Sequence, residues 1–195
     1  MSKETSKAMR RRWREDATGA IPWRSFFGGR GIDVGCGPDK LPFAECIGFD
    51  QEDGDANGLS RYFAPGEFDY LHSSQSLEHM HNPRAAIRDW LKVVKSGGYL
   101  IITVPSWELY EYMRWPSVYN PDHKSTWSMN LRGSPAGVNH VHVPTYLADL
   151  SFATRMILAR QLDVNYNYAI GASVDQTWDE ASGVEPWIEI VLQTL

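Results

Sequence analysis

Two glycines and two aspartates follow the first two apolar runs of the sequence. Residues 31–37 read GIDVGCG, and residues 46–50 read CIGFD. A glycine turn after a buried strand lets the backbone approach a ligand closely. An acid at the end of the next strand, here Asp50, suits the two hydroxyls of a ribose. Asp55 follows soon after and suits an adenine amino group. The stretch therefore predicts a nucleoside-binding pocket.

The spacing of the glycines argues against a dinucleotide. Gly35 and Gly37 fit the first two positions of the Gly-x-Gly-x-x-Gly pattern, but Lys40 holds the third. Pro38 also removes a backbone N–H from the place where a pyrophosphate would lie. S-adenosylmethionine carries no phosphate and needs an acid for its ribose and room for its methionine arm. The pattern therefore favours S-adenosylmethionine over NAD.

The elements that must position these residues alternate between strand and helix. Four apolar runs predict buried strands: 31–35, 46–50, 68–74 and 99–105. Between the last two, a helix is expected to be capped by Asn82, to begin at Pro83 and to stop at Gly97. This order predicts an α/β fold with a doubly wound, mostly parallel sheet.

The connections between the first strands are too short for full crossover helices. Pro42 would break a helix after the first strand, and only QEDG separates Asp50 from Asp55. We therefore expect reduced helices after strands one and two. One face of the sheet then needs other cover, either a second subunit or the aromatic side chains near the N-terminus. These side chains are Trp13, Trp23, Phe26 and Phe27.

The whole chain is expected to form one domain, residues 1–195. It divides into an N-terminal cap segment, a cofactor-binding half, a substrate-side insertion, and a closing helix and strand pair. The corresponding residues are 1–30, 31–105, 106–144 and 145–195. The insertion is long and aromatic, as functional loops often are. The pattern of 144–161 predicts a helix, and LDVNYNYAI with PWIEIVLQTL predicts the closing pair.

Several segments together resemble class I S-adenosylmethionine-dependent methyltransferases, in particular the type 11 group. They are IDVGCGP, GFD, GDA, FDYLHSSQSLEHM, LKVVKSGGYLIITVP and NPDHKSTWS, in order from residue 32 to residue 128. The resemblance implies a seven-stranded Rossmann-like sheet with an antiparallel last strand. It also implies S-adenosylmethionine as the cofactor and a set of cofactor-binding residues. That set is Asp33, Gly35, Cys36, Gly37, Asp50, Gln51, Asp55, Ala56, Ser73 and Ser74.

Two histidines are the candidates for chemistry on a methyl acceptor. In this fold an acceptor approaches from the loops after the fourth and fifth strands, where His79 and His123 lie. One is expected to be the general base and the other to orient the acceptor, with Asp122 steering His123. His140 and His142 share a face and could hold a metal with Asp122, but their spacing matches no ligand set. We therefore predict no metal site.

Composition limits the partners and the compartment. The net charge of −5 argues against a nucleic-acid acceptor, although five basic side chains gather near the N-terminus. We expect a solvated helix face there, with a nucleic-acid or lipid contact as the alternative. No apolar run suits a membrane span or a signal peptide, so cytoplasmic localisation is expected.

The expected function is methyl transfer from S-adenosylmethionine to a hydroxyl or amine of a small molecule or glycan. The alternatives are a nucleic-acid or protein methyltransferase, and a non-catalytic module that only binds the cofactor. A homo-oligomer is a further alternative, because a second subunit could cover the sheet.

Overall fold

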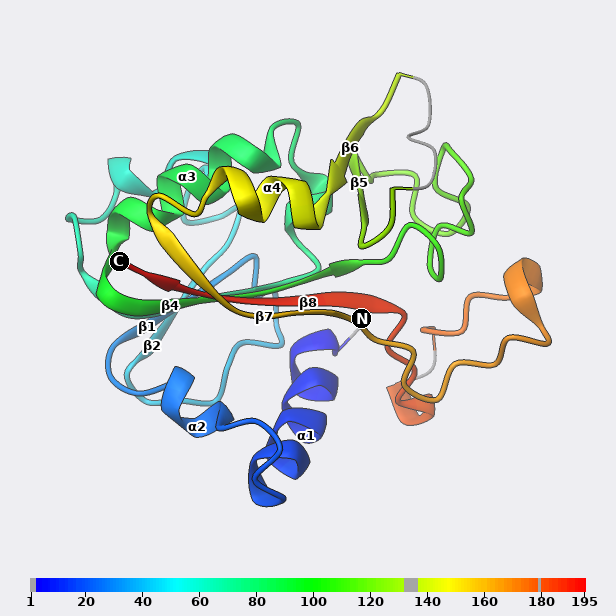
Figure 1. Ribbon diagram of the computed structural model, residues 1–195, viewed down its shortest axis with the longest axis horizontal. Helices are drawn as coiled ribbons and strands as arrows, with labels where there is room; N and C mark the ends of the chain where they lie inside the picture. The colour runs from blue at the N-terminus through cyan, green and yellow to red at the C-terminus, as the bar shows by residue number, and fades with distance from the viewer. Residues whose placement is uncertain (1–2, 132–136, 179) are drawn as a thin grey trace.

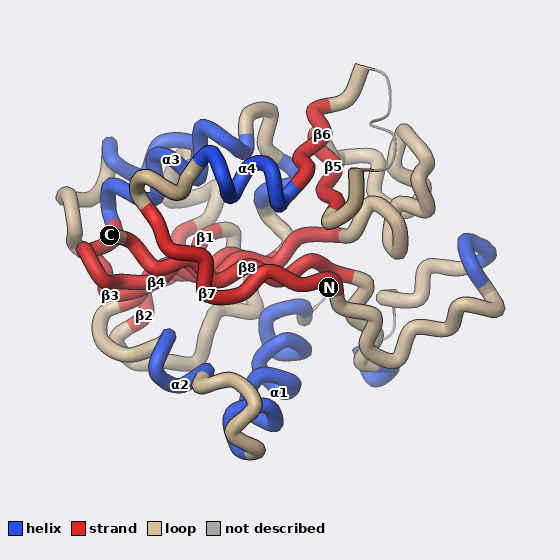
Figure 2. Tube along the Cα trace, in the orientation of Figure 1, coloured by secondary structure: helices blue, strands red, loops and turns tan. Residues whose placement is uncertain are grey.

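A six-stranded mixed sheet forms the centre of the computed structural model, which describes residues 3–131, 137–178 and 180–195. Its strands are β1 Gly31–Val34, β2 Cys46–Phe49, β3 Phe68–Ser74, β4 Val94–Pro105, β7 Thr154–Gln161 and β8 Trp187–Thr194. Their spatial order is β2-β1-β3-β4-β8-β7 (Figures 1 and 2). The first four strands run parallel, and β8 is antiparallel to both β4 and β7. The α/β prediction and the antiparallel last strand are confirmed.

The expected seventh strand is not among the described residues of this sheet, and β2 forms its edge. After β2 the chain turns at once, and a short 3-10 helix, η1 (Ala56–Arg61), leads on to β3. The chain between β2 and β3 is too short to hold another strand with its own crossover. The same shortness confirms the prediction of reduced helices after the first two strands.

Helices cover both faces of the sheet. α1 (Glu4–Ala17) and α2 (Trp23–Phe26) lie on one face, and α3 (Pro83–Val93) and α4 (Val143–Asp149) lie on the other (Figures 1 and 2). No described helix is long and apolar enough to cross a membrane.

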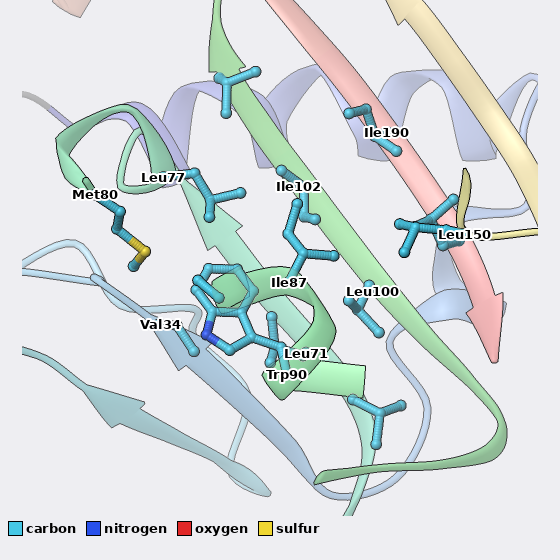
Figure 3. Close-up of a cluster of buried hydrophobic side chains, with 14 of the residues drawn as sticks. Val34, Leu71, Leu77, Met80, Ile87, Trp90, Leu100, Ile102, Leu150 and Ile190 are labelled. Carbon is cyan, nitrogen blue, oxygen red and sulfur yellow. The ribbon is translucent and has the colours of Figure 1, made fainter. Parts of the chain in front are cut away.

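The larger core lies between the sheet and α3. Ile87 and Trp90 of α3 pack against Leu71, Leu100 and Ile102 of the central strands (Figure 3). The predicted start of this helix is confirmed, because the Asn82 side chain accepts a hydrogen bond from the N–H of Ala85.

The smaller core confirms the expected cover by N-terminal aromatic residues. Trp23, Phe26 and Phe27 pack against Tyr70 and Ile101 on the other face of the sheet. This face is where the short connections leave the first strands without crossover helices of their own. The N-terminal segment therefore closes the fold within one chain.

The expectation of a solvated basic face on α1 is wrong for three of its cations. Lys7, Arg11 and Arg12 are buried. Arg12 is fully buried, and its Nε donates to Glu189 of β8 at 2.9 Å. A buried cation needs such a carboxylate partner. Arg11 and Arg12 are thus held by carboxylates of the protein itself.

The closing segment differs from its predicted form. Only Val143–Asp149 is helical, and the second half of the predicted helix is the edge strand β7. Residues 162–170 form no strand beyond a bridge from Val164 to Glu185. The spacing of apolar residues in a short run does not distinguish a helix from a strand. Residues 154–161 form a strand because they pair with β8.

The insertion contains a second, two-stranded sheet. Its strands are β5 Ser125–Ser128 and β6 Asn139–His142, which run parallel. In Figure 1 they lie beyond the end of β4, on the side of the sheet where α4 lies. Three further 3-10 turns are η2 Leu77–His79, η3 Gly171–Ser173 and η4 Glu180–Ser182.

Candidate active site

Two cavities meet at the carboxyl ends of β1 and β3. The nucleoside-side cavity, of about 580 Å³, is lined by Asp50, Asp55 and Ala56 among others. The acceptor-side cavity, of about 510 Å³, is lined by Cys36, Gly37, Ser74, Glu78, Tyr110, His123 and further residues of α1 and the segment before β8. Gly35, Gln75 and His79 line both. The two cavities therefore share a wall at the strand ends, where α/β sheets bind ligands.

The turn after β1 depends on glycine. Gly35 has a φ of +70°, and a Cβ there would lie 2.1 Å from the Ser76 hydroxyl. The N–H of Gly37 donates to the Asp50 carboxylate at 2.5 Å, and the N–H of Gln51 donates to its other oxygen at 2.7 Å. Both oxygens of Asp50 are thus held at the wall of the nucleoside-side cavity.

Asp55 has a structural partner in addition to its place at the cavity. Its carboxylate accepts from the backbone N–H of Asn57 at 2.9 Å and so caps η1. These hydrogen bonds from Asn57, helped by the charge of Arg61, lower the pKa of Asp55. Ala56 lies beside it on the same wall.

Two of the expected cofactor-binding residues line neither cavity. Asp33 is buried below the turn, where it accepts from the N–H of Leu41 at 2.8 Å and pairs with His72 at 2.6 Å. Its carboxylate therefore holds the turn rather than a ligand. Ser73 is also buried, and its hydroxyl has no hydrogen-bond partner among the described residues. Cys36 and Ser74, in contrast, line the acceptor-side cavity.

His79 and His123 come together as predicted, with ring centroids 5.0 Å apart. The Nδ1 of His79 lies 3.0 Å from Asp122, and the Nδ1 of His123 lies 2.5 Å from Glu111. A carboxylate only accepts, so each Nδ1 donates a proton to its partner, and Nε2 is the ring nitrogen left to meet an acceptor. The expected pairing was wrong in one respect, because Asp122 orients His79 and Glu111 orients His123.

A buried acid completes the group. Glu78 Oε1 lies 3.9 Å from Nε2 of His79 and 4.0 Å from Nε2 of His123. Burial raises the pKa of Glu78, against the opposing effect of the two histidines. Burial alone would lower the pKa of His123, but the hydrogen bond to Glu111 and the charges of Glu78 and Glu111 raise it.

Sequence reasoning missed Glu78, Glu111 and Gln75 as members of the site. Glu78 carried a signal, since it adjoins His79 in the Leu-Glu-His segment. Gln75 and Glu111 carried no such signal, because only the fold brings Gln75 to the two cavities and Glu111 to His123. The described residues do not bring Asp122, His140 and His142 together as a metal-binding group. Nδ1 of His140 faces Thr126 at 2.7 Å, and Nδ1 of His142 faces Thr145 at 2.6 Å.

The residues present fit S-adenosylmethionine. The positive φ of Gly35 brings the backbone to the shared wall without a side chain, as close approach of a ligand requires. Asp50 supplies a carboxylate at the cavity wall, which suits a ribose diol. The backbone N–H of Gly37 already donates to Asp50, so it does not serve as a donor to a phosphate.

Comparisons with known proteins agree with this geometry. Residues 6–150 match the model of the methyltransferase domain family. A comparison with curated protein sequences found no match. Among solved structures, an S-adenosylmethionine-dependent methyltransferase from Archaeoglobus fulgidus aligns with 100% of this chain and 95% of its own, with a TM-score of 0.58 and 17% identity.

Two further structures share the fold. A methyltransferase from Mesorhizobium loti aligns over 86% of this chain and 92% of its own, with a TM-score of 0.52 and 15% identity. A Haloferax volcanii methyltransferase solved with the Trm112 activator aligns over 98% of this chain and 93% of its own, with a TM-score of 0.55 and 15% identity. The chain therefore belongs to the methyltransferase domain family, as a class I S-adenosylmethionine-dependent methyltransferase.

Proposed function

We propose that this enzyme methylates a hydroxyl or amine of a small molecule or glycan. The observation that carries the proposal is the histidine pair at the shared wall of the two cavities. Each ring is fixed by a carboxylate on Nδ1 and leaves Nε2 free to act. His79 and His123 both line the acceptor-side cavity, and His79 also lines the nucleoside-side cavity.

The cofactor is assigned to both cavities. Asp50 and Gln51 are proposed to bind the ribose, and Asp55 and Ala56 the adenine, because all four line the nucleoside-side cavity. The methionine arm is assigned to the wall of the other cavity. Its proposed contacts are Gly35, Cys36, Gly37 and Ser74.

The proposed chemistry combines alignment with proton removal. When bound, S-adenosylmethionine supplies a methyl group on a positively charged sulfur, and transfer makes a bond from the acceptor oxygen or nitrogen as the sulfur–carbon bond breaks. The protein holds the acceptor close to that carbon. Nε2 of one histidine takes the acceptor proton, and the other histidine orients the acceptor.

The walls of the acceptor-side cavity favour a small, neutral or cationic acceptor. Tyr110, Trp178 and Trp187 offer flat faces that suit a sugar or aromatic ring, and Asn120 and Asp175 offer polar contacts. The acids of this wall, with the net charge of −5, would repel a polyanion. These features support a small molecule or glycan over a nucleic acid.

Labelled methyl transfer tests the proposal. The protein is incubated with methyl-labelled S-adenosylmethionine and four acceptor pools: hydroxyl or amine small molecules, glycans, proteins and RNA. We expect label only in the first two pools. Label confined to protein or RNA would contradict the acceptor class, and no transfer to any pool would contradict the proposed activity.

Variants of the two histidines are then assayed with the acceptor that the labelling experiment identifies. His79→Ala and His123→Ala are expected to lower turnover by about 10²–10⁴-fold. Their affinity for S-adenosylhomocysteine should stay within a few-fold of wild type. His81→Ala is the matched control, since His81 is exposed in the same segment and lines neither cavity. Near-full turnover in both variants would assign the pair a structural role.

A further inference from the structure

We propose that Glu78, His79 and His123 form a binding site for a divalent transition-metal ion. Each offers one ligand atom, and these atoms all lie within 4.8 Å of one another. Two of the residues belong to η2, and the third lies in the segment that leads into β5. The proposal deepens the function proposed above, because the site faces the acceptor-side cavity.

The first argument is the orientation of the histidines. Metal-binding histidines almost always donate their second ring N–H to a carboxylate or carbonyl, which fixes the ring and raises its basicity. Asp122 does this for His79, and Glu111 does it for His123. The Nε2 atoms of the two rings lie 3.9 and 4.0 Å from Oε1 of Glu78.

The second argument is that Glu78 is buried and one of its carboxylate oxygens lacks a hydrogen-bond partner among the described residues. Glu78 is 1% exposed, yet its Oε2 has no hydrogen-bond partner among the described residues. Oε1 lies 3.9 and 4.0 Å from the two Nε2 atoms, beyond hydrogen-bond distance. A buried carboxylate oxygen without a partner is costly, and a cation between the three groups would remove that cost.

The third argument is that the backbone holds the ligand segments together. The N–H of Lys124 donates to the carbonyl of Glu78 at 2.7 Å. This bond joins η2 to the residue after His123 and fixes the spacing of the ligands independently of any ion. Such support is what a pre-formed metal site requires.

Ligand type and number indicate the class of ion. Two imidazoles and one carboxylate suit zinc or another divalent transition metal, whereas magnesium and calcium prefer oxygen ligands. Donors around a tetrahedral ion at about 2.1 Å would be about 3.4 Å apart, so the two pairs with Glu78 need to close by roughly 0.5 Å. The two histidine nitrogens, which lie within 4.8 Å of each other, need to close by up to about 1.4 Å. Three protein ligands leave a position open toward the cavity, as in catalytic zinc sites.

An ion in this site would change how the acceptor is activated. A cation lowers the pKa of a hydroxyl that approaches it, so that the proton leaves to solvent before the methyl transfer. The histidines would then act as ligands, and the imidazole base described above would apply to the metal-free site. Chelation is accordingly expected to change turnover with hydroxyl acceptors.

Titration with Co²⁺, followed by visible absorption, tests the proposal on protein without a polyhistidine tag. We expect saturation at one ion per chain and a spectrum of low-symmetry coordination. Glu78→Gln and His123→Ala should abolish that signal, and Glu111→Gln should weaken the affinity about 10–100-fold. His81→Ala should match wild type. Cooperative thermal unfolding of each variant shows that it is folded.

Three results would overturn the metal site. They are no saturable Co²⁺ signal in the wild type, an unchanged signal in folded Glu78→Gln, and saturation by Mg²⁺ but not by Co²⁺. Because Co²⁺ binding is measured without cofactor or acceptor, its failure leaves the proposed methyl transfer untouched. Conversely, a failure of all acceptor pools would leave the metal result standing.

Discussion

The carboxylate of Asp50 accepts a 2.5 Å hydrogen bond from the N–H of Gly37, which ties the end of β2 to the turn after β1. One carboxylate therefore both fixes the glycine turn and lines the nucleoside-side cavity. Ligand binding and the geometry of the turn depend on the same side chain. This relationship explains how the site can form with so little chain between the first two strands.

Asp50→Ala should weaken the binding of S-adenosylhomocysteine by on the order of 2–3 kcal/mol, because charge-assisted ribose bonds and the anchor of the turn are lost together. Isothermal titration calorimetry measures the change. Glu52→Ala serves as the control, since Glu52 is exposed on the same turn and lines neither cavity. Equal affinity of Asp50→Ala and wild type would assign the ribose to another acid.

The thiol of Cys36 provides a pH-dependent reporter of the acceptor-side cavity, where the methionine arm is proposed to bind. Burial and the charges of Asp33 and Asp50 raise the pKa of its thiol to about 11. The thiolate is the reactive form, so alkylation should rise about tenfold per pH unit from pH 7 to 10 without a plateau. In a Cys46→Ala background Cys36 is the only thiol, and S-adenosylhomocysteine should slow its reaction with iodoacetamide. A plateau near pH 8 or no protection would contradict this placement.

Glu189 links the N-terminal helix to the sheet. Its carboxylate accepts from Arg11 at 2.7 Å, from Arg12 at 2.9 Å and from Arg160 at 2.7 Å, and its side chain is fully buried. Glu189→Gln should lower the free energy of unfolding by about 3–5 kcal/mol, because buried cations lose their partner. Urea unfolding measures the loss. The exposed Glu45→Gln should change the stability by no more than about 0.5 kcal/mol.

The same carboxylate predicts the direction of acid unfolding. Burial alone would raise the pKa of Glu189, but Arg12 and Arg11 lower it from 4.5 to about 2. A depressed folded pKa gives stability that is present above pH 4.5 and is lost as the pH falls toward 2. Urea midpoints measured from pH 5 to 2.5 should therefore fall less steeply in Glu189→Gln than in wild type. If the urea midpoints of wild type and Glu189→Gln fell equally with pH, Glu189 would not contribute to acid unfolding.

How far the sequence predicts this structure depends on how far apart in the sequence the interacting residues are. The helix that begins at Pro83 was predictable, because its cap, first residue and apolar spacing are local signals. Residues 154–161 were not, since their strand exists through pairing with β8. Arg12 was assigned to solvent for the same reason, as Glu189 lies far along the chain.

The site shows the same division. The glycine turn of residues 35–37 and Asp50 are close in sequence and were predicted as neighbours, and the structure places them together. His79 and His123 were paired through the fold implied by the resemblance. Glu111 could not be identified, because a single acid in an irregular segment has no periodic or motif signal that places it beside His123.

A crystal structure with bound S-adenosylhomocysteine tests the central claim most directly. We expect the ribose hydroxyls on Asp50, the adenine beside Asp55 and Ala56, and the sulfur facing the cavity that His79 and His123 line. A ribose held by another acid, or a sulfur directed away from both histidines, would contradict the site proposed here.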